Sequence, residues 1–132
     1  MDEKHTLTLD SVSKIFDQGK SPLTVLDSLT YTFGSEESYA LTGASGSGKS
    51  TLIHILGGLD SPTQGSVFFD DQNINKFTTE QRSLFLNRDI GLVFQEPMLL
   101  NELSVIENVM LKGLIIGKSS SECKKHALEL LE

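Results

Sequence analysis

One segment constrains the fold of this 132-residue chain more than any other, and it lies at residues 43–50. It reads Gly43-Ala44-Ser45-Gly46-Ser47-Gly48-Lys49-Ser50 and fits the pattern G-x-x-x-x-G-K-[ST]. Glycines at these positions permit the backbone angles that let successive N–H groups converge on phosphate oxygens. The short run at 38–42, continuous rather than alternating, predicts a strand before the loop, and a helical stripe follows it. That stripe consists of Leu52, Ile55, Leu56 and Leu59.

A strand, a glycine-rich loop and a helix in succession predict a nucleotide site and disfavour a flexible linker. Lys49 is expected to reach the β- and γ-phosphates of the nucleotide, and the Ser50 hydroxyl to bind Mg²⁺. A guanine-specific site would show N-K-x-D, but Asn75-Lys76-Phe77 is followed by Thr78. The sequence also contains no D-x-x-G, so a small GTPase is disfavoured.

The remaining pattern predicts an α/β domain with an antiparallel β appendage. Apolar and polar residues alternate in two stretches of 6–33, around turn residues at 19–22, which indicates paired antiparallel strands. A further strand is expected at 67–69, and the apolar run at 90–94 predicts a buried strand. Three helix starts carry a capping box, in which a hydroxyl and a Glu or Gln satisfy free backbone N–H groups. They are Thr78 with Gln81, Ser104 with Glu107, and Ser119 with Glu122.

Composition excludes several classes of protein. Eleven basic against eighteen acidic residues give a net charge of −7, which argues against a nucleic-acid binder. Cys123 is the single cysteine, so it forms no internal disulfide and is expected to fill apolar space. The three histidines lack metal-ligand spacing, and Asp70-Asp71 is expected to form a turn. The apolar stretch 105–116 is too short to span a bilayer, and no secretion signal is visible.

Runs on both sides of the loop resemble a known family, the ATP-binding subunits of ABC transporters. The similarity extends from Thr6 to Glu132. Its motifs are the phosphate loop, Gly58-Leu59-Asp60-Ser61-Pro62-Thr63-Gln64-Gly65-Ser66-Val67, Ile90-Gly91-Leu92-Val93-Phe94-Gln95, Leu99-Leu100 and Val105-Ile106-Glu107-Asn108-Val109. Arg88 and the cluster at 57–60 favour the lipoprotein-releasing and macrolide-exporter branch, whereas Glu96-Pro97 departs from it.

The resemblance implies a P-loop NTPase core with an N-terminal antiparallel β subdomain. It places that β region at 1–37, the phosphate-loop core at 38–95 and the start of a helical subdomain at 96–132. It implies that ATP is held by residues 43–50 together with Thr51, and that Phe16 stacks on adenine. Lys49 and Gln95 are the implied catalytic residues, with Ser50 and Gln95 as Mg²⁺ ligands.

The family also implies partners and a location. Two ATPase subunits would enclose two ATP molecules and drive transmembrane permease subunits from the cytoplasmic face of the inner membrane, without nucleic acid. Lipoprotein release is the expected transport process. The alternatives are a soluble ABC ATPase acting on DNA or ribosomes, another P-loop NTPase, and an inert fragment.

Three catalytic motifs of the family do not occur in these 132 residues. They are the Walker B strand with its Asp-Glu pair, the L-S-G-G-Q signature and the switch histidine. We expect all three downstream of Glu132, so the domain is expected to be incomplete at its C-terminus. Nucleotide binding without meaningful turnover follows as an expectation. The competing expectation is weak nucleotide binding, because core strands that would cover the central strand are missing.

Overall fold

The computed structural model describes residues 4–17, 19 and 21–132. They form two compact units, Met1–Leu86 and Asn87–Glu132. The first unit carries the phosphate loop.

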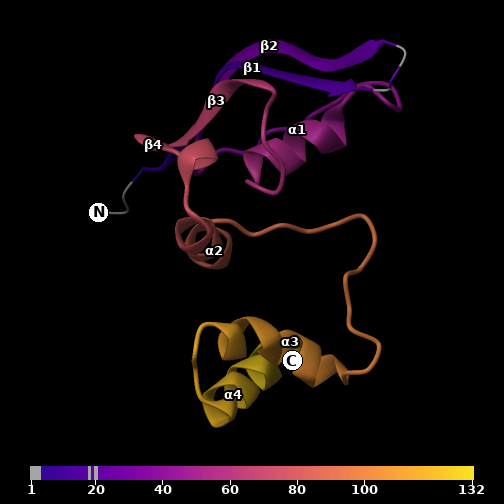
Figure 1. Ribbon diagram of the computed structural model, residues 1–132. Coiled ribbons are helices and arrows are strands. Elements are labelled where there is room, and N and C mark those ends of the chain that lie inside the picture. Colours follow the sequence, from indigo (N-terminus) through magenta and orange to yellow (C-terminus); the bar gives the residue numbers. More distant parts are fainter. Residues whose placement is uncertain (1–3, 18, 20) are drawn as a thin grey trace. The chain divides into compact units, whose positions relative to one another are not determined.

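A four-stranded antiparallel sheet forms the frame of the first unit (Figure 1). Strands β1 (Thr6–Asp17) and β2 (Pro22–Gly34) make a long hairpin, which confirms the predicted pair of alternating strands. Strands β3 (Gln64–Phe69) and β4 (Gln72–Asn73) complete the order β2-β1-β3-β4. The expected strand at 67–69 is therefore the second half of β3.

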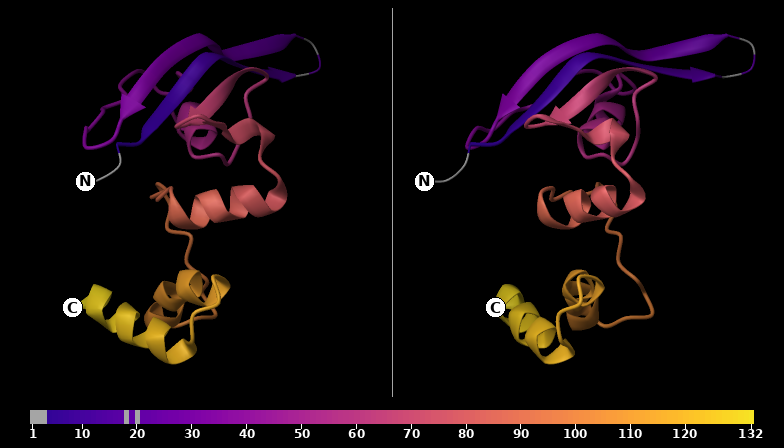
Figure 2. Two further views of the ribbon diagram at one scale, coloured as in Figure 1. Left: turned by 90° about the vertical axis from the view of Figure 1, so that its left-hand side faces the viewer. Right: turned by 60° about the vertical axis from the view of Figure 1, so that its left-hand side comes forward.

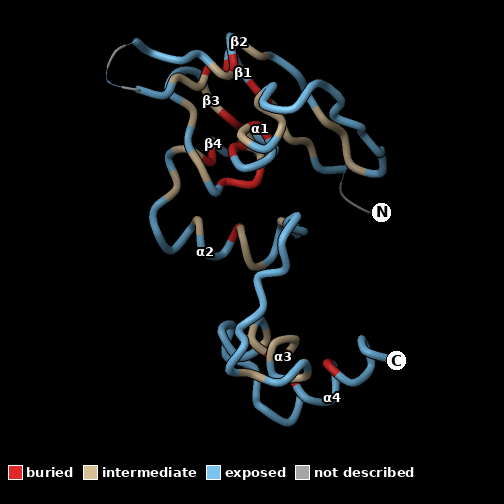
Figure 3. The backbone as a smooth tube through the Cα atoms, turned by 90° about the vertical axis from the view of Figure 1, so that its right-hand side faces the viewer, coloured by how far each residue is buried: buried red, intermediate tan, exposed pale blue. Residues whose placement is uncertain are grey.

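Helix α1 (Lys49–Leu56) lies against one face of this sheet (Figures 1 and 2). The core between them is built from apolar residues of β1, β2, β3 and α1, and buried segments of β1 and β3 face α1 in Figure 3. Its members are Leu9, Val12, Leu26, Leu52, Ile55 and Val67. The last member of the predicted stripe, Leu59, lies outside the helix, because α1 ends at Leu56 with Gly57 as its cap, and Leu59 is exposed.

The polypeptide reverses direction after β3 in a turn, as expected for Asp70-Asp71. Asp70 has a φ of 52°. Its carboxylate accepts a hydrogen bond from the Thr6 N–H at 2.7 Å and pairs with His5 Nδ1 at 2.9 Å. These two contacts lower the pKa of Asp70 below its ordinary value, and the hydrogen bond from the Thr6 N–H is the larger cause. The pair of aspartates thus closes a turn, and Asp70 fixes the start of β1.

Two helical segments follow β4. The 3₁₀ helix η1 (Ile74–Lys76) was not predicted; the Asn73 side chain caps it by accepting from the Asn75 N–H at 3.0 Å. Helix α2 (Thr79–Arg88) begins at the predicted capping box, where the Thr78 N–H donates to Gln81 Oε1 at 2.9 Å. Phe85 of α2 is buried, in contact with the ring of Phe69 from β3.

Two predicted strands are wrong. Residues 38–42, before the phosphate loop, and residues 90–94, after α2, are irregular, and neither belongs to the sheet. Leu41 is exposed, and Val93 is 100% exposed. A strand exists only through hydrogen bonds to a neighbouring strand, and the described chain provides no neighbour for either segment. Apolar composition alone therefore does not make them strands.

The second unit is a pair of packed helices, α3 (Val105–Ile115) and α4 (Ser120–Leu131), which lie side by side in Figures 1 and 2. Both begin at the predicted capping boxes, with Ser104 and Ser119 as N-caps. A small core of Met110, Cys123 and Ala127 joins them, which confirms the expected filler role of Cys123. Over the described residues, no helix has the length and apolar character that crossing a bilayer requires.

Candidate phosphate-binding site

The predicted phosphate loop forms an exposed, glycine-rich turn that leads directly into α1. Gly46 and Gly48 have φ angles of 78° and 89°, in the left-handed region that glycine tolerates best. Gly48 is the N-cap of α1, and no side chain caps the helix there. The first-turn N–H groups and the positive end of the helix dipole are therefore available to an anion.

Strand β2 positions the loop at its junction with α1. A Cβ atom on Gly48 would lie 2.8 Å from Val25 Cγ1 and 3.0 Å from the Val25 carbonyl oxygen. Such short distances leave room only for glycine, so the backbone of the loop packs directly against β2. Sequence reasoning missed Val25, because the motif carries no signal for the residue on which its last glycine packs.

Lys49 is held at the loop rather than extended into solvent. Its Nζ donates to the carbonyl oxygens of Gly43 at 2.9 Å and Ala44 at 2.7 Å, and lies 3.4 Å from Ser47 Oγ. These contacts span the loop from its first residue to its fifth. A positive charge is thus fixed among the same residues whose backbone surrounds a phosphate in this motif.

Ser50 and Thr51 follow on the first turn of α1. Ser50 is exposed and Thr51 is half-buried. A hydroxyl oxygen is a ligand type that Mg²⁺ accepts, usually together with phosphate oxygens and water rather than within an all-protein cage. Among the described residues, no cluster of His, Cys, Asp and Glu could hold a metal ion by itself. The donor set therefore fits Mg²⁺ brought in with a nucleotide.

Phe16 lies near the end of β1, paired with Leu23 of β2, and the residue is 40% exposed. Lys14 Nζ lies 5.2 Å from the centroid of its ring. An aromatic ring with this exposure has the free surface that stacking on a base requires. Phe16 and the loop belong to the same unit, as the predicted adenine contact requires.

Gln95 belongs to the second unit, in the exposed segment between α2 and α3. Its assignment as a ligand of Mg²⁺ stays a prediction that depends on the family resemblance.

Comparison with known proteins gives the family. Residues 26–132 match the ABC transporter family. The ATP-binding protein LolD of the lipoprotein-releasing system from Idiomarina loihiensis is 40% identical over 125 residues, which are 95% of this chain and 55% of that protein. LolD from Nitratidesulfovibrio vulgaris is 43% identical over 94% of this chain and 53% of its own length. The chain thus spans about half the length of the curated relatives it matches.

Comparison with solved structures supports the same family. The ATP-binding cassette MJ0796, in a dimeric post-hydrolysis state bound to ADP and Pi, superimposes with a TM-score of 0.86 at 32% identity. A further dimeric structure of this bacterial ABC transporter cassette gives 0.78 at 30% identity. Each comparison covers 93% of this chain and 54% of the cassette. The protein with the phosphate loop on α1 and the hairpin beside it is a member of the ABC transporter family and corresponds to the N-terminal portion of its ATP-binding domain.

Proposed function

We propose that this chain binds Mg·ATP at residues 43–51 and supplies the nucleotide-contacting half of an ABC transporter ATPase. The observation that carries the proposal is the N-terminus of α1: its cap is Gly48, no side chain occupies it, and Lys49 Nζ is held over the loop carbonyls. Backbone donors, helix dipole and ammonium thus meet at one exposed place in a chain of net charge −7.

Each site residue has a role set by its chemistry. The amides of the loop and of the first turn of α1 hold the phosphates, and Lys49 adds a positive charge near the β- and γ-phosphates. Ser50 and Gln95 are the proposed protein ligands of Mg²⁺, which neutralises phosphate charge when bound. Phe16 offers its exposed ring to adenine. In the complete ATPase, these groups would stabilise the charge that develops during γ-phosphate hydrolysis.

The transport setting is proposed from the relatives. Proteins named as ATP-binding components of the lipoprotein-releasing system match nearly the whole chain at about 40% identity. We therefore propose release of lipoproteins, with integral membrane subunits as partners and the cytoplasmic face of the inner membrane as the location. A second copy as partner is supported by the dimeric cassettes to which the chain is similar.

Calorimetric titration of the 132-residue chain with ATP in the presence of Mg²⁺ tests the site. We expect micromolar binding, with the Lys49→Ala variant at least about tenfold weaker because a charge-assisted contact to phosphate is lost. Lys76→Ala, which removes an exposed lysine from η1, is the matched control and should bind as the parent does. Equal affinity of the parent and Lys49→Ala, or binding far weaker than micromolar in both, would contradict the proposal.

The partner is tested separately from the site. A tagged full-length protein that contains these residues should co-purify from detergent-solubilised membranes with an integral membrane subunit. Co-purification with ribosomes or DNA instead would favour a soluble ABC ATPase and would contradict the transport setting while leaving the nucleotide site intact.

A further inference from the structure

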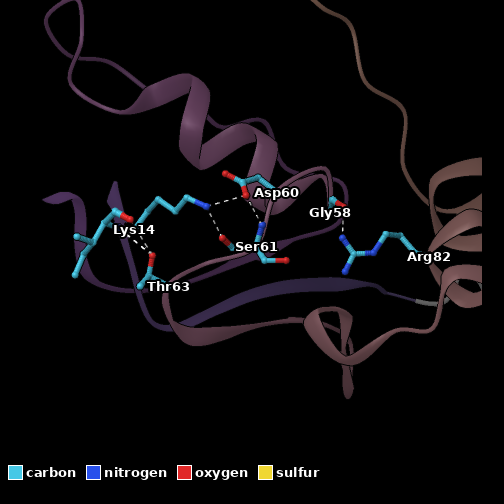
Figure 4. A network of polar contacts seen from close by, with 7 residues as sticks. Lys14, Gly58, Asp60, Ser61, Thr63 and Arg82 are labelled. Carbon is cyan, nitrogen blue, oxygen red and sulfur yellow. Dashed lines mark hydrogen bonds and ion pairs between the residues drawn. The ribbon is translucent and has the colours of Figure 1, made fainter. Parts of the chain in front are cut away.

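A covered lysine lies outside the phosphate loop, on β1. The side chain of Lys14 is only 13% exposed, and a lysine enclosed to that extent needs charged or polar partners. Its Nζ donates to Asp60 Oδ1 at 2.7 Å and to the carbonyl oxygen of Ser61 at 2.8 Å, as Figure 4 shows. Asp60 and Ser61 follow the C-terminal end of α1, so Lys14 joins β1 to the helix that begins in the phosphate loop.

The groups that hold Lys14 are themselves held. The Ser61 N–H donates to Asp60 Oδ1 at 2.7 Å, which orients the carboxylate. The Ile15 N–H, between Lys14 and Phe16 on the strand, donates to Thr63 Oγ1 at 3.0 Å. The segment after α1 therefore forms hydrogen bonds with two consecutive residues of β1. These contacts hold the Lys14 side chain in one rotamer, so its ammonium has a defined position.

That position is over an aromatic ring. Lys14 Nζ lies 5.2 Å from the centroid of Phe16, within the distance of a cation–π interaction. A fixed cation on one face draws π density toward itself, which reduces the repulsion that an electron-rich purine meets at the opposite face. It also restricts the orientation of the ring, while Phe16 as a residue stays 40% exposed.

We propose that Lys14 is a positioning residue for the base of the bound nucleotide: fixed by Asp60, it occupies one face of the Phe16 ring and orients the ring so that adenine stacks on the other. The inference rests on the proposed function, because it takes ATP as the ligand and Phe16 as the surface for its base.

A nucleotide requires such an arrangement because its base and its phosphates are two ends of one ligand. The surface for the base and the loop for the phosphates must keep a set separation if both are to be occupied together. Val25 on β2 contacts Gly48 at the start of α1, and Lys14 on β1 contacts Asp60 beyond its end. The hairpin is therefore fixed to α1 at both ends of the helix.

The test compares ATP with inorganic tripolyphosphate, which has the phosphates and no base, by calorimetric titration of the full chain with Mg²⁺. Lys14→Met keeps the long unbranched side chain and removes the cation. We expect it to weaken ATP binding about fivefold, while tripolyphosphate affinity changes by less than about twofold. Lys14→Arg keeps the cation and its donors and should restore most of the ATP affinity. Circular dichroism checks that each variant is folded.

Two further variants make the test specific. Asp60→Ala removes the side-chain acceptor and the charge that pair with the ammonium, and it should reproduce the selective loss of ATP affinity even if Lys14→Met fails to fold. In a Phe16→Ala background, Lys14→Met should have no further effect on ATP binding, because there is no ring left to orient.

The outcomes separate this inference from the proposed function. Equal losses of ATP and tripolyphosphate affinity in Lys14→Met, or an undiminished effect in the Phe16→Ala background, would overturn the positioning role and leave the nucleotide site standing. A parent chain that binds ATP no better than tripolyphosphate would overturn it as well. A parent chain that binds neither ligand would overturn both proposals.

Discussion

At the scale of single residues, Gly48 is the position on which the phosphate loop most depends. Two requirements meet there: a φ of 89°, and a backbone that touches Val25. Gly46 shares the first requirement, with a φ of 78°, but a Cβ at that position would meet nothing within 4 Å. Comparison of these two glycines therefore separates backbone strain from close packing.

Gly46→Ala is expected to lower the free energy of unfolding by about 1 kcal/mol, the cost of a left-handed non-glycine residue. Gly48→Ala should cost about 3 kcal/mol, because steric overlap with Val25 adds to the same strain. Urea denaturation of both variants measures the difference. Equal losses would show that β2 does not position the loop.

Asp60 gives the fold a defined response to acid. Hydrogen bonding from Lys14, followed by the backbone contact from Ser61, lowers the pKa of Asp60 below its ordinary value of 3.8. A lowered folded-state pKa contributes stability that is fully present above the unfolded-state value and is lost as the pH falls through the folded-state value.

The difference in unfolding free energy between the parent and Asp60→Asn should thus be constant above about pH 5 and shrink below pH 3.8. Denaturant titrations at a series of pH values measure it, with Asp71→Asn as the charge-matched control in an exposed turn. A difference that does not change between pH 5 and pH 3 would mean that the Asp60 contact with Lys14 is absent in solution.

At the scale of elements, the helices are specified by signals that lie within them. Each capping box closes on itself: Ser104 and Ser119 accept from the N–H of Glu107 and Glu122, whose side chains return to the serine N–H groups. The serine hydroxyls are the first cause of the lowered pKa of both glutamates. Such starts were predicted correctly because no distant residue is needed to complete them.

The contact between α3 and α4 is set by a close approach at Gly113. A Cβ on Gly113 would lie 2.6 Å from Cys123 Sγ, although alanine is the better helix former by about 1 kcal/mol. We expect the overlap to exceed this gain, so Gly113→Ala should destabilise the helix pair. The double variant Gly113→Ala/Cys123→Ala should recover the loss, since it removes the sulfur. Thermal unfolding, monitored by circular dichroism, measures the stability of each variant. A Gly113→Ala single variant more stable than the parent would refute the packing argument.

At the scale of the whole molecule, the chain carries the phosphate-loop motif without the residues that activate water in its family. The sequence has no apolar run followed by Asp-Glu and no L-S-G-G-Q. We predict that the purified 132-residue chain binds Mg·ATP and releases no phosphate above background in a steady-state assay. Hydrolysis that is abolished by Lys49→Ala would contradict this prediction, because it would show that a general base lies within these residues.

How far the fold could be predicted depended on where each element's hydrogen bonds are made. The hairpin β1–β2, helix α1 and the capped helices follow from patterns inside the segments themselves. The strands expected at 38–42 and 90–94 did not form, because a strand is completed by a neighbour that no local pattern can guarantee. In the site, the loop residues were found from their motif, whereas Val25 and Asp60 act through contacts that only the folded chain reveals.

The two irregular apolar segments have a consequence for handling the protein. Leu41 and Val93 are exposed to solvent, and both lie in irregular segments outside the sheet. Exposed stretches of this kind favour edge-to-edge association between molecules, which leads to aggregation as the concentration rises. Mutual repulsion from the net charge of −7 opposes that association and weakens as salt is added. Ligand affinities of this chain should therefore be measured at low ionic strength and modest protein concentration, where the molecules repel one another and stay in solution.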